Sequence, residues 1–447
     1  MIVHNTPSRV ALPWIDPTLV FAQVADRTGS ILMESQPGSG GRWSMICTEP
    51  FAVLECGNGS ATLTSGDGTE SFASVFDGLR SILADPRASV AAGYLGYELH
   101  AHLRDAPIPA PEQTEPFLPD CRLGLYDSAL LFDHEERRLT LHRSDHSDAD
   151  WEQLIAQAGE MDLGAPQGEC SSGEPVSGFS KAEFLDAVRA VKAYIASGDI
   201  YQANLSQRFT IPTSMPPWEA YLRLRESNPA PYAAYLNLGS FQIVSSSPEC
   251  FLTFDPVTQL VETKPIKGTR PRGASECDDR QLADELLSSE KDRAENVMIV
   301  DLERNDLGRV CEFGSVEVPG LFSLESHPTV HHLVSTVTGT LRSECDRVDL
   351  LMACFPGGSI TGAPKIRAME IIAELEPVPR YVYTGSIGWF GSDGSMNLNI
   401  AIRTAVFKDG LCYLHVGGGI VADSDPEMEY QETLDKGRAF FEVLGCA

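Results

Sequence analysis

The sequence predicts an α+β fold, in which helices and antiparallel strands occupy separate segments of the chain. Short β-type runs separated by glycine and aspartate turns fill the first 100 residues and return after residue 380. Amphipathic helical segments follow residue 179, do not alternate regularly with strands and show no fixed-period repeat. With 447 residues the chain exceeds one ordinary core, so we expect two domains or one large composite domain.

The N-terminal region is predicted to consist mainly of strands, in "ILMES", "FAVLEC", "VAAGYLGY", "LGLYDSALLFD" and "RLTLHR". The proline-rich stretch "DAPIPAPEQTEPFLPD" cannot maintain a regular ladder of backbone hydrogen bonds, so we expect a surface loop there. "GAPQGECSSGEPVSG" is rich in Gly, Ser and Pro. It predicts a linker at residues 166–178, between an N-terminal region at 1–165 and a C-terminal domain at 179–447.

The first predicted helix of the C-terminal domain has clear start and stop signals. Ser180 forms a capping box with Glu183, an apolar face follows, and Gly198 ends the helix. The run "DDRQLADELLSSEKDRAENVMIV" predicts a second helix, which carries Glu295 near its end.

Two further helices are predicted towards the C-terminus. One begins in "TGAPKIRAMEIIAEL", with Pro364 in its first turn and a buried stripe made by Ile366, Met369 and Leu375. The other is "DPEMEYQETLDKGRAFFEVL", opened by Asp425. "YVYTGSIGWF", "NLNIAIRTAVF" and "LCYLHVGGGIV" lie between these helices and alternate as strands do.

Composition and charge exclude several classes of function. The formal net charge of -29 repels polyanions, so we expect neither nucleic acid nor an anionic membrane as a partner, and an anionic ligand needs a locally positive site. The absence of a long apolar stretch or a signal-peptide pattern predicts no membrane span and no secretion. Eleven cysteines without a C-x-x-C pair predict reduced thiols in a cytoplasmic protein.

The last predicted helix carries a candidate metal site. Glu429, Glu432 and Lys436 are three and four residues apart, so they share one helix face. This face is either a solvated surface or part of a Mg²⁺ site, since Mg²⁺ takes one or two carboxylates and keeps waters and substrate oxygens. Glu295 is a candidate second ligand, but spacing alone does not place it opposite Glu432.

Glycine-rich segments are candidate anion sites. "PGGSITGAPK" lacks the Lys and Ser or Thr of a phosphate loop, which excludes triphosphate binding, but its amides can still face a carboxylate. "GGGIV" is either a similar site or a tight hairpin turn. Arg403 lies in an apolar predicted strand, where its charge needs a partner, either a structural carboxylate or an anionic ligand.

Two polar clusters are ambiguous at this stage. His331 and His332 are adjacent, so in a strand they point to opposite faces and cannot bind one metal together. We expect one of them to be a core residue and the other a site residue. "DLERNDLGR" is more typical of a local salt-bridge network than of a catalytic group.

Nine blocks in a fixed order resemble the chorismate-utilising enzymes: "GDIYQANLSQRF", "SSSPECF", "PIKGTRPRG", "AENVMIVDLERNDLGRV", "HHLVSTVTG", "FPGGSITGAPK", "YTGSIGW", "NLNIAIRT" and "GGGIVADSDPEMEYQETLDKG". "LMES" and "NPAPYAAY" extend the similarity over most of the chain. The resemblance implies a four-layer sandwich of two antiparallel sheets between helices. Residues 1–165 resemble the N-terminal domain of anthranilate synthase component I, and 179–447 the chorismate-binding catalytic domain.

Two positions indicate a branch of this family. Members that use water carry a lysine where this chain has Gln202, whereas ammonia-using members carry glutamine. Lys267 in "PIKGT" is typical of the branch that makes 4-amino-4-deoxychorismate for 4-aminobenzoate and folate biosynthesis, and anthranilate-forming members have alanine there. The resemblance implies ammonia from a separate glutamine amidotransferase subunit, component II. The alternatives are an anthranilate-forming enzyme and a catalytically inactive regulatory subunit.

The resemblance also implies a covalent mechanism. Lys267 attacks C2 of chorismate with an allylic shift and loss of the C4 hydroxyl, which Glu249 protonates, and ammonia then adds at C4 and expels the lysine. A lysine amine is a nucleophile only when neutral. Burial together with the nearby cations Arg270 and Arg272 is therefore expected to lower its pKa.

Further site residues follow from the same resemblance. Mg²⁺, held by Glu295 and Glu432, is expected to bind the ring carboxylate of chorismate. Arg403 and Tyr383, with amides near Gly417 and Gly418, are expected to hold the enolpyruvyl carboxylate. The ring pocket is expected to contain Gly268, Thr269, His332 and Lys436. A pocket where relatives hold L-tryptophan is matched by Ser35, Arg42, Trp43, Pro231, Tyr232 and Ala233.

Overall fold

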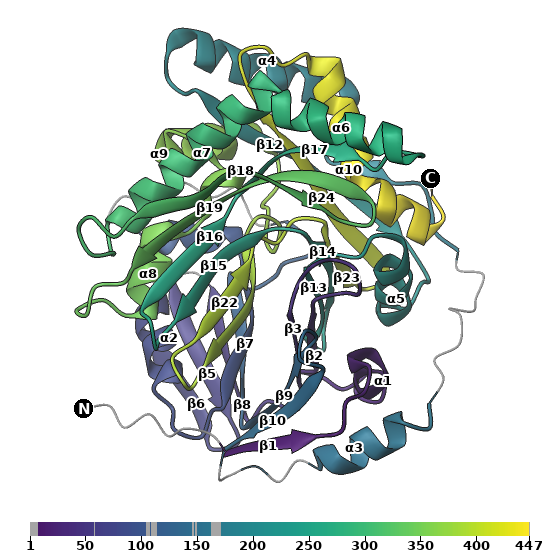
Figure 1. Cartoon of the computed structure of the whole chain (residues 1–447), viewed down its shortest axis with the longest axis vertical. Coiled ribbons are helices and arrows are strands. Elements are labelled where there is room, and N and C mark those ends of the chain that lie inside the picture. Colours follow the sequence, from purple (N-terminus) through teal and green to yellow (C-terminus); the bar gives the residue numbers. More distant parts are fainter. Residues whose placement is uncertain are drawn as a thin grey trace.

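Two large antiparallel sheets lie face to face and carry helices on their outer faces (Figure 1). The computed structural model describes residues 8–57, 59–103, 108, 114–144, 147, 150–161 and 171–446. One cluster of buried apolar residues, including Ile31, Val90 and Ile243, fills the space between the sheets. Further apolar clusters lie between each sheet and its helices. The predicted α+β sandwich of four layers is therefore confirmed.

The first sheet combines strands from the two ends of the chain. Residues before 144 supply β1, β10, β9, β3 and β2, and residues after 175 supply the others. Its strand order is β1 (Ser8–Leu12), β10 (Arg138–Arg143), β9 (Ser128–Asp133), β3 (Trp43–Cys47), β2 (Ile31–Glu34), β13 (Tyr232–Asn237), β14 (Gln242–Ser247), β23 (Thr404–Lys408), β24 (Leu411–Ile420), β12 (Gln202–Pro212) and β11 (Val176–Ser177), with β20 (Gly362–Ala363) paired to β12.

The second sheet is built in the same way. Strands β7, β8, β4, β5 and β6 come from the N-terminal region and join strands from the C-terminal domain. The order is β17 (Ile266–Pro271), β19 (Val330–Thr340), β16 (Leu260–Lys264), β15 (Cys250–Asp255), β22 (Met396–Asn399), β21 (Ser386–Gly391), β7 (Val90–Leu95), β8 (Cys121–Tyr126), β4 (Ala52–Gly57), β5 (Ser60–Ser65) and β6 (Gly68–Phe72), with β18 (Glu317–Ser326) paired to β19.

The helices cover the two outer faces. Those on the first sheet are α1 (Pro17–Phe21), α3 (Trp151–Ala158), α4 (Lys181–Ser197), α5 (Pro217–Ser227), α9 (Lys365–Leu375) and α10 (Pro426–Leu444). Those on the second sheet are α2 (Val75–Leu83), α6 (Glu276–Ser288), α7 (Glu290–Gly308) and α8 (Arg347–Cys354), and short 3₁₀ turns occur at η1 (Tyr97–His102) and η2 (Gly358–Ile360). Within the described residues, no helix is long and apolar enough to cross a membrane.

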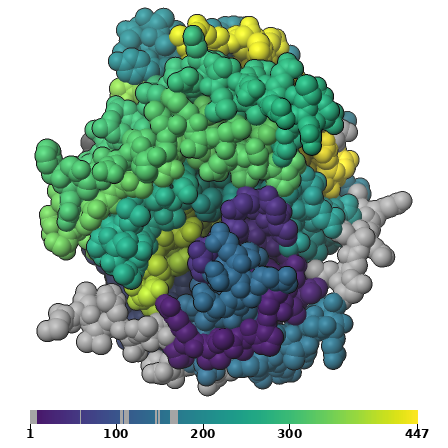
Figure 2. Space-filling model, viewed as in Figure 1, coloured from purple at the N-terminus to yellow at the C-terminus, as the bar shows by residue number. Residues whose placement is uncertain are grey.

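The predicted boundary at 166–178 does not separate two cores, because both sheets mix strands from its two sides. In Figure 2 the N-terminal residues, purple and blue, adjoin the teal and green residues over one continuous surface. Residues 166–170 of the predicted linker lie outside the described residues, whereas 176–177 pair with β12. Half of the predicted proline-rich loop, 105–107 and 109–113, also lies outside the described residues.

Helix α4 confirms its predicted limits, since Ser180 and Glu183 form the capping box and Gly198 ends the helix in a left-handed conformation. The single helix predicted at 278–300 is wrong. Ser289 adopts an extended conformation, ends α6, and caps α7 by accepting a hydrogen bond from the Asp292 amide. Serine competes with helical hydrogen bonding through such caps.

Two other local predictions are also wrong. Ile366 is 51% exposed rather than part of the buried stripe of α9, and Pro364 caps that helix instead of lying in its first turn. Arg403 does not lie in a strand. It has a φ of 50° in the segment between β22 and β23, where the chain crosses from the second sheet to the first.

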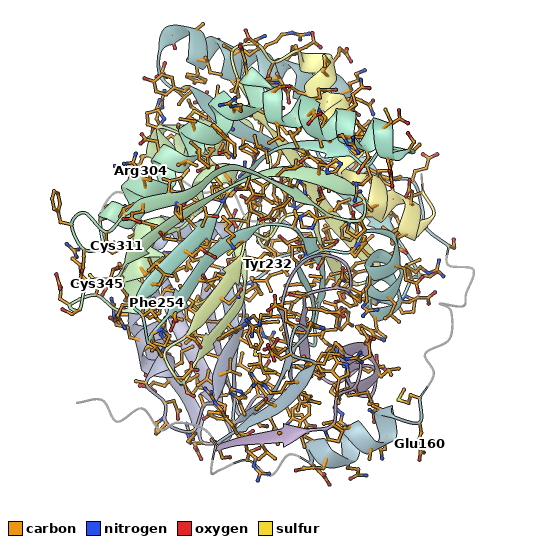
Figure 3. The ribbon with its side chains drawn as sticks, in the orientation of Figure 1. Glu160, Tyr232, Phe254, Arg304, Cys311 and Cys345 are labelled. Atoms are coloured by element: carbon orange, nitrogen blue, oxygen red, sulfur yellow. A yellow bond between two sulfur atoms is a disulfide. The ribbon has the colours of Figure 1, made fainter. Side chains whose placement is uncertain are left out.

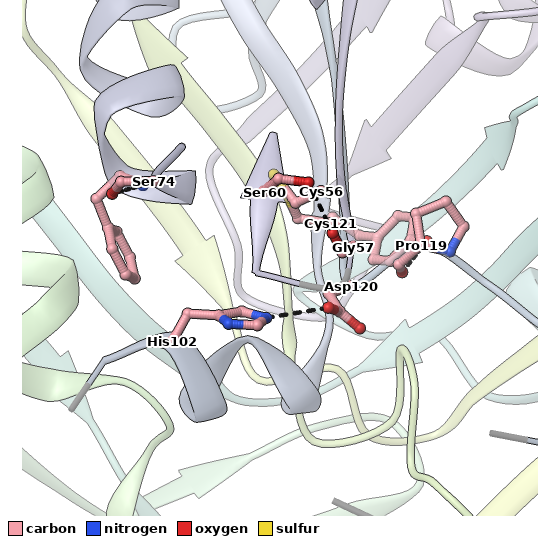
Figure 4. Close-up of a disulfide and its surroundings, with 10 residues drawn as sticks. Cys56, Gly57, Ser60, Ser74, His102, Pro119, Asp120 and Cys121 are labelled. Atoms are coloured by element: carbon pink, nitrogen blue, oxygen red, sulfur yellow. Dashed lines mark hydrogen bonds and ion pairs between the residues drawn. A yellow bond between two sulfur atoms is a disulfide. The ribbon is translucent and has the colours of Figure 1, made fainter. Parts of the chain in front are cut away.

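The prediction that all cysteines are reduced is contradicted at one pair. Cys56 of β4 lies directly opposite Cys121 of β8, with Cα atoms 4.9 Å apart, and the two form a disulfide (Figure 4). His102 and Asp120 form a hydrogen bond beside it, with 3.1 Å between Nε2 and Oδ2. The two cysteines are 65 residues apart in sequence, so only the pairing of β4 with β8 brings them together. The other described cysteines are free.

Candidate active site

A cavity of about 750 Å³ opens between the two sheets, where β17 and α7 face β24 and α10. It brings together most of the residues predicted for the site. Its lining includes Glu249, Lys267, Gly268, Thr269, Glu295, His332, Tyr383, Arg403, Gly417, Glu432 and Lys436. Gln202 and Gly418 do not line this cavity. Gln202 lies against Gly419, and Gly418 against Glu432, and both of these residues do line it.

Lys267 reaches the cavity from an irregular part of β17. The pairing of β17 with β19 shifts register between Ile266 and Thr269, and Gly268 has a φ of 91°. Such a bulge re-aims a side chain. The Lys267 amine points across the cavity, and its Nζ lies 3.3 Å from where a Cβ on Gly419 would stand.

The pKa of Lys267 is lowered mainly by burial, which disfavours the ammonium form, and by the nearby Lys436. Glu295, Glu249 and Glu432 act in the opposite direction. The expected role of Arg270 and Arg272 is not borne out. Arg270 is neutralised by Glu285 at 2.9 Å and Asp292 at 3.1 Å, and Arg272 by Asp279 at 2.7 Å.

Glu249 lies just before β15 and is 4% exposed. Burial is the main cause that raises its pKa to about 6, and the Ser359 hydroxyl, Lys267 and the Ile266 amide oppose this. The Ile266 amide donates to Oε1 at 3.3 Å. A carboxyl with this pKa retains its proton in weakly acidic solution, as a general acid requires.

Gln202 is fully buried at the start of β12, and its side-chain amide has no hydrogen-bond partner within the described structure on either Nε2 or Oε1. A Cβ on Gly419 would lie 2.3 Å from Gln202 Nε2. Lys267 Nζ and the amide of Gln202 therefore lie near the same point. An unsatisfied buried amide of this kind is costly unless a ligand pairs with it.

The glycines Gly417 to Gly419 lie within β24 rather than in a hairpin turn. The physical reason is space. A Cβ on Gly417 would approach the Leu205 carbonyl to 2.6 Å, and one on Gly418 would lie 3.3 Å from Glu432 Oε1. The glycines thus allow β12, α10 and the Lys267 amine to crowd against one strand.

The two predicted metal ligands line the same cavity from different helices. Glu295 comes from α7 and Glu432 from α10, and Glu432 contributes to the raised pKa of Glu295, whose main cause is burial. Glu295 has only a 4.0 Å contact with Lys291 among the ion pairs and hydrogen bonds of the described residues. Its pKa is raised by burial, which Lys267 and Lys291 oppose and the neighbouring acids reinforce.

Glu432 forms a 2.7 Å ion pair with Lys436, which also donates to the Gly417 carbonyl at 2.8 Å. Burial acts to raise the pKa of Glu432, but Lys436, Lys267 and Lys291 together outweigh it and the net pKa is lowered. Two carboxylates in a cavity suit a hard cation that completes its shell with water and substrate oxygens, so this donor set fits Mg²⁺. Within the described residues no group of three His, Cys, Asp or Glu side chains is placed to hold a metal alone.

Arg403 projects into the same cavity and has no ion-pair partner among the described side chains, which decides against a structural salt bridge. Burial lowers its pKa, and Tyr383 and Glu432 act against this. Tyr383 stacks on His415 with ring centroids 5.3 Å apart. A guanidinium and a phenol on one wall suit a carboxylate ligand.

The histidine pair divides as expected. His332 lines the cavity beside Thr269, with 2.9 Å between Nδ1 and Oγ1, and burial lowers its pKa to about 3, so it is neutral. His331 faces away and pairs with Asp279 at 3.0 Å. Sequence reasoning did not single out three further lining residues, namely Asn204, Ser359 and His415, although all three lie in or beside the quoted blocks.

The residues predicted for a tryptophan pocket lie apart from this cavity. The Ser35 hydroxyl donates to the Pro231 carbonyl at 3.0 Å, and the Tyr232 carbonyl accepts from Asn399 at 3.1 Å. Arg42 pairs with Asp133 at 2.8 Å and covers the ring of Trp43. Ala233 pairs with Glu34 between β13 and β2. Tryptophan binding stays a prediction.

The sequence profile of the chorismate binding enzymes matches residues 29–442. The chain belongs to this family. Among chorismate binding enzymes, aminodeoxychorismate synthase component 1 of Klebsiella aerogenes is 40% identical over 96% of this chain and 97% of that protein. A Haloarcula marismortui protein named anthranilate synthase component 1 1 is also 40% identical, over 98% of this chain and 92% of its own length.

A solved structure of the same family has the same fold. Anthranilate synthase component I of Streptococcus pneumoniae superposes with a TM-score of 0.76 and 30% identity, covering 95% of this chain and 97% of that one. The isochorismate synthase MenF of Escherichia coli, 19% identical with a TM-score of 0.74, covers 98% of this chain and 95% of its own and shares the fold.

Proposed function

We propose that this chain aminates chorismate at C4 and forms 4-amino-4-deoxychorismate, as the name of its Klebsiella relative indicates for that protein. The observation that carries the proposal is the position of the Lys267 amine, which shares one cavity with Glu249, Glu295 and Glu432 and feels the charge of all three. Burial favours the neutral, nucleophilic form of this amine. An alanine at position 267 would remove this amine from the cavity.

The proposed reaction has two substitutions. Lys267 Nζ forms a bond to C2, the ring double bonds shift, and the C4–O bond breaks while Glu249 gives its proton to the departing hydroxyl, which leaves as water. Ammonia then forms a bond to C4, the double bonds shift back, and the Lys267 amine leaves C2. Glu249 regains a proton from the ammonium group of the product.

The other residues of the cavity bind and orient chorismate in this proposal. Arg403 and Tyr383 hold one carboxylate, and the unpaired amide of Gln202 beside Lys267 offers hydrogen bonds to the ring substituents or to ammonia. Glu295 and Glu432 would hold Mg²⁺, which supplies positive charge for the ring carboxylate. A locally positive site of this kind admits a dianion to an acidic protein.

We also propose that ammonia comes from a glutamine amidotransferase subunit and that the product serves 4-aminobenzoate and folate biosynthesis. The support is that several similar proteins are named component 1, which implies a second component.

Product analysis tests the proposal. Purified protein is incubated with chorismate, Mg²⁺ and ammonium, and an aminodeoxychorismate lyase is added to one of two samples. We expect 4-aminobenzoate only in the sample with lyase. Anthranilate in both samples would establish amination at C2 instead, which the similarity to the Haloarcula protein makes the principal rival. No consumption of chorismate would indicate an inactive regulatory subunit.

A further inference from the structure

A group of buried ionisable residues lies next to the active-site cavity. None of them has a role in the proposed reaction. Glu303 and Asp306 are on α7, two turns or more beyond Glu295, and are 2% and 4% exposed. Glu303 lies eight positions after Glu295 on this helix, which is about 12 Å along the axis. The same helix therefore carries a cavity residue at one point and this buried group at another.

Glu303 holds the turn η2. The Gly358 amide donates to Glu303 Oε1 at 2.8 Å, and Oε2 has no hydrogen-bond partner among the described residues. A Cβ on Gly358 would lie 2.9 Å from the same Oε1, so the close contact requires glycine. Burial is the main cause that raises the pKa of Glu303 to about 7.

A second set of contacts, made by Lys365, fixes the segment that leads into the same turn. Lys365 of α9 pairs with Asp306 and donates to the carbonyls of Cys354 at 2.9 Å and Pro356 at 2.7 Å. The segment 354–358 is thus held at one end by a lysine and at the other by a carboxylate. Burial of a carboxylate lowers the stability of the fold unless the group is paired or hydrogen-bonded. We therefore expect these two carboxylates to serve the geometry or the charge of this region.

The turn presents Ser359 to the active site. Ser359 directly follows Gly358, is 6% exposed and lines the cavity together with Glu249, and its hydroxyl acts to lower the pKa of that carboxyl. Glu303 is therefore connected to Glu249 through the Gly358 amide and the neighbouring Ser359, which acts on the carboxyl of Glu249.

We propose that Glu303 is a positioning residue for Glu249. By accepting from the Gly358 amide it fixes the turn from which Ser359 holds the carboxyl of Glu249 towards the substrate. The inference rests on the role of Glu249 as general acid in the proposed function. It assigns Glu303 no contact with substrate.

The pH dependence of turnover reports this arrangement. The Ser359 hydroxyl stabilises the ionised form of Glu249, so its loss raises the pKa of that carboxyl. The charged groups that act on Glu249 are Lys267 from β17 and Lys436 from α10, which favour its ionised form. Burial and, less strongly, Glu249 raise the pKa of Glu303 on α7 to about 7, so Glu303 is largely protonated where Glu249 titrates. Activity that needs protonated Glu249 then persists to higher pH.

The test compares Glu303→Leu, Ser359→Ala and the double variant. Chorismate consumption is measured against pH at constant free ammonia and saturating Mg²⁺. Each single variant is expected to lower kcat about 10-fold and to move the alkaline limb of the profile upward by about 0.5–1 pH unit, the worth of one hydrogen bond. The double variant is expected to show no further movement of the limb.

Three controls sharpen the comparison. Glu303→Gln keeps an acceptor for the Gly358 amide and is expected to leave the limb in place. Asp301→Asn changes an exposed ion pair with Arg304, which lies on the outer side of α7 (Figure 3), and is expected to behave as wild type. Gly358→Ala displaces Glu303 without removing it and is expected to move the limb upward as Glu303→Leu does. It therefore replaces Glu303→Leu in the comparison if that variant does not fold.

An unchanged limb in Glu303→Leu and Gly358→Ala, with a shift in Ser359→Ala, would overturn the proposal. So would a downward shift in Glu303→Gln of similar size, because it would assign the effect to charge rather than to the turn. Formation of anthranilate by the wild type would contradict the proposed function and leave this inference intact, since chorismate consumption reports Glu249 whichever carbon is aminated.

Discussion

The Nζ of Lys267 and the side-chain amide of Gln202 approach the same point beside Gly419, although they come from strands of different sheets. A Cβ placed on Gly419 would lie 3.3 Å from the amine and 2.3 Å from Gln202 Nε2. The two sheets thus bring the Lys267 amine next to the unpaired side-chain amide of Gln202. The chemistry proposed for this chain depends on that proximity.

Replacement of Lys267 tests the covalent route. Lys267→Ala removes the amine, and Lys267→Arg replaces it with a group that stays protonated. We expect both variants to lose at least 100-fold in the rate of C4 amination, since each lacks a neutral nucleophile. The rate of 4-aminodeoxychorismate formation is the measurement. Lys264→Ala, which alters an amine paired with Glu262 in β16, is the matched control and should retain activity.

Glycine 419 is expected to accept no side chain. Gly419→Ala places a methyl group against Gln202 and the Lys267 amine, which must move. We expect at least a 10-fold fall in kcat with a small change in the thermal unfolding midpoint. Gly308→Ala is the control, because a Cβ at the end of α7 meets nothing within 4 Å. Equal activity of the two variants would contradict the crowding around β24.

The general acid sets the direction of the pH dependence. The pKa of Glu249 is raised to about 6, mainly by burial, and the carboxyl is protonated below that value. Turnover at constant free ammonia is therefore expected to fall as the pH rises through this region. Glu249→Gln, which cannot act as an acid, is expected to lose at least 100-fold in kcat and the alkaline limb with it. A wild-type rate that rises steadily to pH 9 would contradict this assignment.

Magnesium binding is expected without substrate as well as during turnover. Chelation by EDTA should abolish activity, and added Mg²⁺ should restore it. In the absence of chorismate, Mg²⁺ should raise the thermal unfolding midpoint of the wild type, because a ligand that binds only the folded state stabilises it. Glu295→Gln and Glu432→Gln should lose this shift. Glu442→Gln, an exposed change on α10, should keep it.

The Arg380–Glu376 pair is expected to dominate stability near the site. Arg380 is 2% exposed, pairs with Glu376 at 2.7 Å and donates to the Asn204 and Ile360 carbonyls. Arg380→Met leaves the Glu376 charge buried and unpaired, which costs about 3–5 kcal/mol in the free energy of unfolding. Denaturant titration measures it. Arg189→Met, which breaks an exposed pair with Asp186, should change stability by less than about 0.5 kcal/mol.

Local signals in the sequence predicted much of the architecture. The capping box at Ser180, the strands "FAVLEC" and "VAAGYLGY" and the helix after Asp425 are all present. Failures occurred where a single residue competed with its neighbours. Ser289 divides a continuous helical pattern, and Arg403 interrupts an apolar run with a φ of 50°.

The ordered motifs by themselves determined the family, the residue types of the site and Lys267 as the candidate nucleophile. Only the tertiary structure placed Glu295 in the same cavity as Glu432, put the glycines of β24 beside Lys267, neutralised Arg270 and joined Cys56 to Cys121. The physical reason is that helical and strand periodicities fix which residues share a face, whereas distances between elements depend on the packing of two sheets whose strands come from both ends of the chain.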